Sequence, residues 1–149
     1  NVEGINMVNA PFIAKDRGVE VKESKSTEVH EYTSTMTVTA KTSKGKRSVT
    51  GSVFGKGDSR IVQFNEFHFE AVLSSHMLVL TNIDVPGVIG KLGSVLGANK
   101  INIAGFHLGR IKEGDKAVAV VNIDSQPDSE TVSALREIEG VLNVSTVLL

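Results

Sequence analysis

In the first half of the chain, apolar and polar residues mostly alternate, which is the period of a β-strand with one buried face. Met36, Val38 and Ala40 alternate with threonines, and Val49 and Val53 again fall on one face. Turns that contain glycine separate the segments, as in hairpins. The pattern predicts an antiparallel sheet built from strands at 19–22, 33–40, 48–54, 60–65 and 67–72.

After residue 76 the apolar spacing switches between two and about 3.6 residues. Strands are predicted at 77–83, 102–111, 117–123 and 141–148. Two amphipathic helices are predicted between them, one with Val88, Ile89, Leu92, Val95 and Leu96 on its apolar face and one with Val132, Leu135 and Ile138. Asp128 is the expected N-cap of the second helix. The order β-α-β-β-α-β predicts a ferredoxin-like domain.

The predicted fold class is therefore α+β, with an antiparallel-sheet domain at 1–73 and a ferredoxin-like domain at 77–149. The first domain has one short predicted helix, which Asn9 would cap and in which Pro11 stands near the first position. One short helix hardly covers the sheet, and the sequence starts at Asn1 without methionine. We expect the first domain to be incomplete and more chain to precede Asn1.

The strand at 117–123 is apolar on both faces, since Val118 and Val120 alternate with alanine, valine and isoleucine. In a four-stranded ferredoxin-like sheet both helices lie on one face, so the other face would be bare unless something covered it. We expect the first domain or another subunit to cover it. The alternative is a few scattered exposed valines, which need no explanation.

Composition narrows the possible partners. The 149 residues carry 16 basic and 17 acidic side chains, for a net charge of −1, and aromatic residues make up only 5%. This balance argues against binding to nucleic acid or to anionic membrane. There is no cysteine, which excludes disulfides and thiolate chemistry, and no apolar run is long enough to span a bilayer. We expect a cytoplasmic protein.

No catalytic or metal-binding motif stands out, so no catalytic residue and no metal site are expected in this chain. The four histidines, at positions 30, 68, 76 and 107, lack metal-ligand spacing. The glycines at 87, 90, 93 and 97 fall within a predicted helix rather than in a phosphate-binding loop, and Gly90 and Gly93 are expected to allow close packing of helix on sheet.

One group of residues has the chemistry of an amino-acid site. Asn82 and Asp84 end a predicted strand, and the helix that follows has free amide groups near Gly87 and Val88 that could bind a carboxylate. Asp84 could bind an ammonium group, and the amides of Asn82 and Asn102 could bind a hydroxyl. The alternative is purely structural, with Asp84 shaping a turn and Asn102 ending a loop.

Two stretches, residues 82–93 and 101–104, resemble an ACT domain, a regulatory module that binds amino acids; the resemblance extends over 77–149. Residues 8–11, 17–21, 51–53 and 60–62 resemble the intervening, or allosteric substrate-binding, domain of long bacterial D-3-phosphoglycerate dehydrogenases, and 103–110 also fit that family. The resemblance implies the C-terminal regulatory part of such an enzyme. The catalytic domains would lie upstream, bind NAD and oxidise 3-phosphoglycerate in the first step of L-serine synthesis, and this part would need no cofactor.

The resemblance also implies that ACT domains pair into a homodimer or homotetramer and that L-serine binds between them as a feedback inhibitor. It assigns the contacts to Asn82, Asp84 and Asn102, with the amides near Gly87 and Val88 for the carboxylate. Many relatives carry histidine or tyrosine at the position of Asn82, so the hydroxyl contact differs here.

The intervening domain of relatives offers basic residues to a phosphate-bearing ligand, and the candidates here are Arg60 and Arg110, although Arg60 also suits a solvated turn. Two other functions stay open. One is the β-chain of an iron–sulfur L-serine dehydratase, which uses the same modules, and the other is an ACT module that only dimerises.

Overall fold

The computed structural model describes residues 4–25, 32, 34–43, 45–55 and 57–149. The chain divides into two compact units, Asn1–Glu31 and Tyr32–Leu149, which are described separately here. Of the helices in the described part of the chain, none combines the length and the apolar character that crossing a bilayer requires.

The first unit contains one helix, α1 (Ala10–Asp16), with proline in its first turn as predicted. Asn9 precedes the helix but does not cap it, because its side chain is used upstream. Its Oδ1 accepts from the Asn6 amide at 2.7 Å, and its Nδ2 donates to the Gly4 carbonyl at 2.8 Å. The strand predicted at 19–22 is wrong, since residues 19–25 form no strand and a strand needs a pairing partner.

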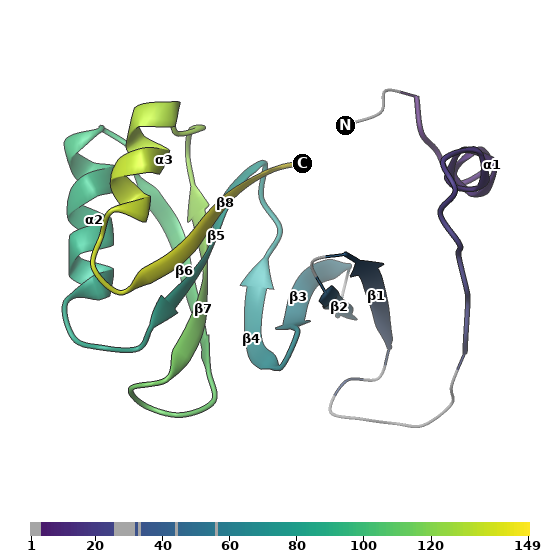
Figure 1. Cartoon of the computed structure of the whole chain (residues 1–149), viewed down its shortest axis with the longest axis horizontal. Helices are drawn as coiled ribbons and strands as arrows, with labels where there is room; N and C mark the ends of the chain where they lie inside the picture. The colour runs from purple at the N-terminus through teal and green to yellow at the C-terminus, as the bar shows by residue number, and fades with distance from the viewer. Residues whose placement is uncertain (1–3, 26–31, 33, 44, 56) are drawn as a thin grey trace. The chain divides into compact units, whose positions relative to one another are not determined.

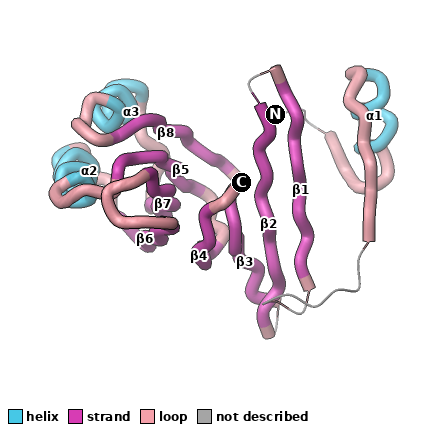
Figure 2. Tube along the Cα trace, turned by 60° about the horizontal axis from the view of Figure 1, so that its bottom comes forward, coloured by secondary structure: helices cyan, strands magenta, loops and turns pink. Residues whose placement is uncertain are grey.

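The first part of the second unit is the predicted antiparallel sheet (Figures 1 and 2). Its strands are β1 (Thr35–Thr42), β2 (Gly45–Phe54), β3 (Asp58–Phe64) and β4 (Phe67–Val72), in the order β1-β2-β3-β4. The strand ends agree with the prediction to within three residues, and Thr33 lies outside the described residues. The edge strand β1 is exposed along its whole length, including Met36 and Val38.

The second sheet comprises β5 (His76–Ile83), β6 (Ile103–Arg110), β7 (Lys116–Ile123) and β8 (Val141–Leu148) in the order β6-β7-β5-β8. The helices α2 (Val88–Ala98) and α3 (Ser129–Arg136) both lie on one face of it (Figure 1). This is the predicted β-α-β-β-α-β arrangement. The structure therefore confirms the α+β fold class, with an antiparallel sheet followed by a ferredoxin-like domain.

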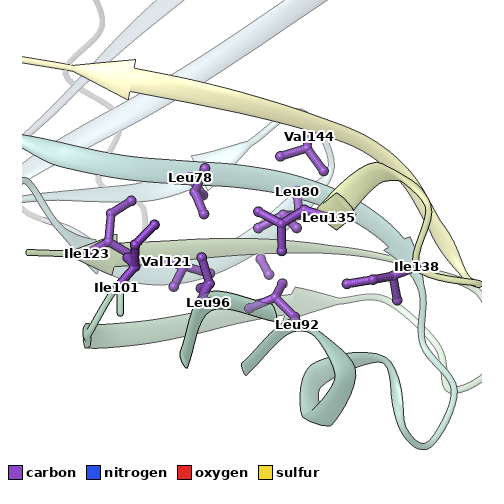
Figure 3. Packing of buried hydrophobic residues seen from close by; sticks show 11 residues of the cluster. Leu78, Leu80, Leu92, Leu96, Ile101, Val121, Ile123, Leu135, Ile138 and Val144 are labelled. Carbon is purple, nitrogen blue, oxygen red and sulfur yellow. The ribbon is translucent and has the colours of Figure 1, made fainter. Parts of the chain in front are cut away.

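A hydrophobic core fills the space between this sheet and its helices (Figure 3). It contains Leu92 and Leu96 from α2, Leu135 from α3 and Leu78 and Leu80 from β5, none more than 2% exposed. Ile138 lies just beyond the end of α3 but is still buried. These contacts explain why the helical spacing of apolar residues predicted both helices correctly.

Two details of α2 differ from the prediction. Ile89 was expected on the buried face but is 47% exposed, because the buried face follows the i, i+4, i+8 positions Val88, Leu92 and Leu96. Gly90 and Gly93 do not pack closely on the sheet, since a Cβ atom built on either meets nothing within 4 Å.

The predicted N-cap of α3 is confirmed. Asp128 Oδ1 accepts a hydrogen bond from the Thr131 amide at 2.7 Å, and this bond to the ionised carboxylate lowers the pKa of Asp128. The cap fixes the first turn of the helix, in which Thr131 is buried against the core.

The helix-free face of the second sheet is covered by the first sheet. Phe67, Phe69 and Ala71 of β4 form a buried cluster with Val118 and Val120 of β7. The expectation that this valine face is covered is therefore confirmed, and the first half of the chain supplies the cover. The contact is close, because a Cβ on Gly109 of β6 would lie 2.7 Å from the Phe69 ring and 3.0 Å from the His68 carbonyl.

Candidate functional site

The end of β5 and the turn into α2 are held by the hairpin between β6 and β7. The Asp84 amide donates to the Asp115 carbonyl at 2.7 Å, and the Gly114 amide donates to the Asp84 carbonyl at 3.2 Å. Asn82, which lies in β5 two residues before Asp84, is 5% exposed, and its Nδ2 donates to the Ile83 carbonyl at 2.8 Å. These bonds fix the backbone on which the predicted site residues stand.

Asp84 forms an ion pair that the sequence did not predict. Its Oδ2 accepts from Arg110 Nη1 at 3.0 Å, with the Asp84 side chain 16% exposed and that of Arg110 56% exposed. Among the described residues, Asp84 Oδ1 has no hydrogen-bond partner. The carboxylate can therefore accept a further charged donor without giving up Arg110.

The start of α2 offers an anion site beside this carboxylate. Gly87 is the N-cap, with φ of +94°, a value that favours glycine, and no side chain caps the helix. The first turn holds no acidic residue. The amides of Val88 and Ile89 are thus donors at the positive end of a helix dipole, while the Val88 side chain is buried in the core.

Asn102 does not join the other predicted residues within one chain. Asn82 pairs with Ala117 at one end of β7, whereas Ile103, which follows Asn102, pairs with Ile123 at the other end. At about 3.3 Å per residue, the six residue steps between these positions separate them by roughly 20 Å. Asn102 Nδ2 instead donates to Asp124 Oδ2 at 2.8 Å.

The structure brings Asn82, Asp84, Gly87, Val88 and Arg110 to one end of the second sheet. Arg110 therefore belongs with the predicted amino-acid site rather than with Arg60, which lies on the first sheet.

Arg60 already forms ion pairs with two carboxylates. Its Nη2 donates to Asp58 Oδ2 at 2.6 Å, its Nη1 donates to Glu70 Oε2 at 2.8 Å, and its guanidinium lies 4.9 Å from the centre of the Phe54 ring. The hydrogen bonds to Asp58 and then to Glu70 raise the pKa of Arg60 above its usual value. An anion at Arg60 must compete with these two partners.

Sequence reasoning missed a cleft of about 850 Å³ between the two sheets, called here the intersheet cleft. Its basic residues are Lys46 and Arg47 at the start of β2 and Lys116 at the start of β7. The signal in the sequence was weak, because these cations are up to 70 positions apart. Arg47 was the one visible signal, because it is a cation on a strand face that otherwise carries apolar residues. It pairs with Ala40, and Val38 and Val49 lie on the same face.

Two family models match consecutive parts of the chain. The D-3-phosphoglycerate dehydrogenase intervening domain matches residues 1–65, and the ACT domain matches residues 76–140. The ACT match contains the whole of the β5-to-α2 site and Asn102.

Similar curated proteins are named D-3-phosphoglycerate dehydrogenase. The Synechocystis protein is 36% identical over 148 residues, which is 99% of this chain and 26% of that protein. The Methanocaldococcus jannaschii protein is 32% identical over 144 residues, which is 97% of this chain and 27% of that protein. The Bacillus subtilis protein is 29% identical over 143 residues, which is 96% of this chain and 27% of that protein. The chain thus spans about a quarter of the length of these relatives. It belongs to the D-3-phosphoglycerate dehydrogenase family and corresponds to its C-terminal regulatory part, an intervening domain followed by an ACT domain.

Proposed function

We propose that this chain is the L-serine-sensing regulatory region of a D-3-phosphoglycerate dehydrogenase, in which serine bound between the ACT domains of two copies inhibits the enzyme. The observation that carries the proposal is the free oxygen of Asp84 beside the uncapped start of α2. A carboxylate next to a cluster of amide donors complements the two charged groups of a free amino acid.

Different residues would bind the different polar groups of serine. Asp84 Oδ1 accepts from the serine ammonium group, and the amides of Val88 and Ile89 donate to the serine carboxylate, with Arg110 adding a positive charge at the same end of the sheet. Asn82 is nearly buried and its Nδ2 is occupied, so it acts mainly by holding the turn. The hydroxyl of the bound serine would then hydrogen-bond to the side chain of Asn102.

A second copy is needed to supply Asn102. β6 is an edge strand, with one side of its backbone unpaired in the sheet order β6-β7-β5-β8. Two copies of β6 pairing antiparallel about a two-fold axis would bring the Ile103 end of one strand beside the Arg110 end of the other. Asn102 of one copy would then meet the Asp84–Arg110 pair of the other copy, giving two equivalent sites in each pair of chains.

Inhibition would follow from this shared site. Serine that contacts two copies binds the paired arrangement more tightly than any other, and it shifts the population of subunits toward that arrangement. Coupling of this kind is typically about 1–3 kcal/mol. The active site, with NAD and 3-phosphoglycerate, would belong to the catalytic domains of such an enzyme, which we place in the cytoplasm. The relatives described above are dehydrogenases, which favours this parent over a serine dehydratase.

One observation favours a second function, a pairing module without a ligand. The ion pair with Arg110 gives Asp84 a partner even when no amino acid is bound. In that case the pair only stiffens the hairpin and the turn, and the ACT domain contributes to assembly alone.

Calorimetric titration of the 149-residue chain with L-serine distinguishes the two functions. We expect L-serine to bind at one molecule per chain, and D-serine and glycine to bind at least tenfold more weakly, about 1.4 kcal/mol, because a misplaced or missing hydroxyl loses its hydrogen bond to Asn102. Equal heats for all three amino acids, or no heat from a folded and paired chain, would contradict serine sensing and leave the pairing module.

A further inference from the structure

The second sheet has two edges, and the strand at one of them lacks the usual protection against pairing. In the order β6-β7-β5-β8, both β6 and β8 carry a row of backbone groups on their outer side that no strand of the sheet pairs. β8 has the sequence VLNVSTVL, without a charged residue or a proline. Charges and prolines are the common means by which edge strands avoid pairing with other chains. β8 therefore needs protection from elsewhere in the fold.

The register of β8 shows which of its backbone groups point outward. The Leu149 amide donates to the carbonyl of Ser75 at 3.2 Å, and these two residues continue the register in which Leu148 is opposite His76. Hydrogen-bonded and non-hydrogen-bonded pairs alternate along antiparallel strands. The residues of β8 that direct both N–H and C=O away from β5 are therefore Val144, Thr146 and Leu148.

One of these outward carbonyls already has a partner. Arg136 is the last residue of α3, and its Nη2 donates to the Val144 carbonyl at 3.1 Å. The helix is held beside β8, because the Val144 side chain is buried in the same core as Leu135 of α3 (Figure 3). The bond also has a charged donor, and such bonds are stronger than those between neutral groups. A fixed helix thus places a guanidinium on the edge of the sheet.

This guanidinium blocks pairing near the middle of β8. A strand that paired there would have to place a backbone nitrogen about 2.9 Å from the Val144 carbonyl oxygen. Arg136 Nη2 lies in that position, so the incoming strand would have to displace it. The outward groups that follow, at Thr146 and Leu148, span less chain than a typical strand of about five to six residues.

The β6 edge has no such block. Within the part of the chain that the structure describes, no side chain forms a hydrogen bond with the backbone of β6. The guanidinium that β6 itself carries, on Arg110, is directed to Asp84. One edge is therefore closed and the other is open, which fits the pairing of two copies through β6.

We propose that Arg136 closes β8 against a second copy of this chain, so that the ACT-domain sheet joins two copies through β6 and no more. With both edges open, each chain would join one copy through β6 and another through β8, and the sheet would extend without limit. A second copy suits β8 because an uncharged strand can pair antiparallel with itself about a two-fold axis without repulsion. The closure depends on Arg136 alone, whereas the size of the assembly rests on the proposed pairing through β6.

Light scattering of the 149-residue chain tests the closure. Arg136→Met keeps a long apolar stem but removes the hydrogen-bond donors. We expect its weight-average mass, at equal concentration, to exceed that of the unmodified chain by about twofold or more and to grow with concentration. Lys112→Met removes the same charge from an exposed position between β6 and β7, and should leave the mass unchanged.

A second substitution distinguishes edge pairing from misfolding. Thr146 is exposed and its backbone groups point outward, so Thr146→Lys gives β8 the charge that edge strands usually carry. Added to Arg136→Met, it should return the mass to that of the unmodified chain. Ser59→Lys is the matched control, because it restores the same net charge at an exposed position of the first sheet. Added to Arg136→Met, it should leave the large assemblies in place.

Equal mass of Arg136→Met and the unmodified chain would overturn the proposal, since Arg136 would then only tie α3 to β8. Assemblies that Thr146→Lys fails to disperse, or that Ser59→Lys disperses equally well, would overturn it too. An unmodified chain that stays single while Arg136→Met forms pairs would support closure of β8 and contradict the pairing through β6. The failure of this proposal and the failure of the proposed function therefore give different results.

Discussion

Gly109→Ala is expected to lower the free energy of unfolding by about 1–3 kcal/mol, the usual cost of forcing an extra carbon into a packed interior. The new Cβ would lie 2.7 Å from the Phe69 ring and 3.0 Å from the backbone carbonyl of His68. The ring can shift, but the carbonyl belongs to β4 and moves only with that strand. The substitution therefore separates the two sheets, and chemical denaturation measures the loss.

The matched control is Gly93→Ala in α2, which makes the same chemical change in open space. Alanine is favoured over glycine within a helix by up to about 1 kcal/mol, so this variant should be as stable as the unmodified chain or more stable. Equal stability of the Gly109→Ala and Gly93→Ala variants would mean that β4 does not pack closely on β6.

Asp84→Asn is expected to raise the dissociation constant for L-serine roughly 10- to 100-fold. A hydrogen bond to a charged group contributes about 1.5–3 kcal/mol, and asparagine keeps the size of the side chain but loses the charge that pairs with the ammonium group. The variant also leaves Arg110 without its carboxylate partner. Calorimetric titration with L-serine measures the change.

Glu113→Gln is the control for this variant. Glu113 is an exposed acid in the neighbouring turn between β6 and β7, and its loss changes the net charge by the same amount. Serine affinity should be unchanged in Glu113→Gln. An equal loss of affinity in both variants would point to general electrostatics rather than to a contact at Asp84.

Local patterns in the sequence were sufficient to predict most of the fold. Alternation predicted the strands of both sheets, and the spacing of Leu92 and Leu96 predicted α2, because each pattern reflects one buried face. Alternation misled at 19–22, where the described residues offer no partner strand. Ile89 was misplaced because the buried face of α2 follows Val88, Leu92 and Leu96, a narrower face than the sequence suggested.

The site was harder to predict than the fold, because its geometry depends on pairs that are distant in the sequence. The turn chemistry around Asp84 and Gly87 was local and could be read from the sequence. The ion pair of Asp84 with Arg110 joins residues on different strands, and the position of Asn102 depends on the register of β6 with β7. The intersheet cleft depends on how two sheets pack, which no local pattern encodes.

The central claim is that serine binds at a site shared by two copies. Its most direct test combines two variant chains in one pair, each lacking one of the contact residues. Asp84→Asn and Asn102→Ala chains, each with a different affinity tag, are produced together and the mixed pairs are isolated and titrated with L-serine. If each site uses Asp84 of one copy and Asn102 of the other, a mixed pair holds one intact site. The account predicts binding at the unmodified affinity with one serine per pair, while pairs of either single variant bind weakly. Weak binding in the mixed pairs as well would contradict it.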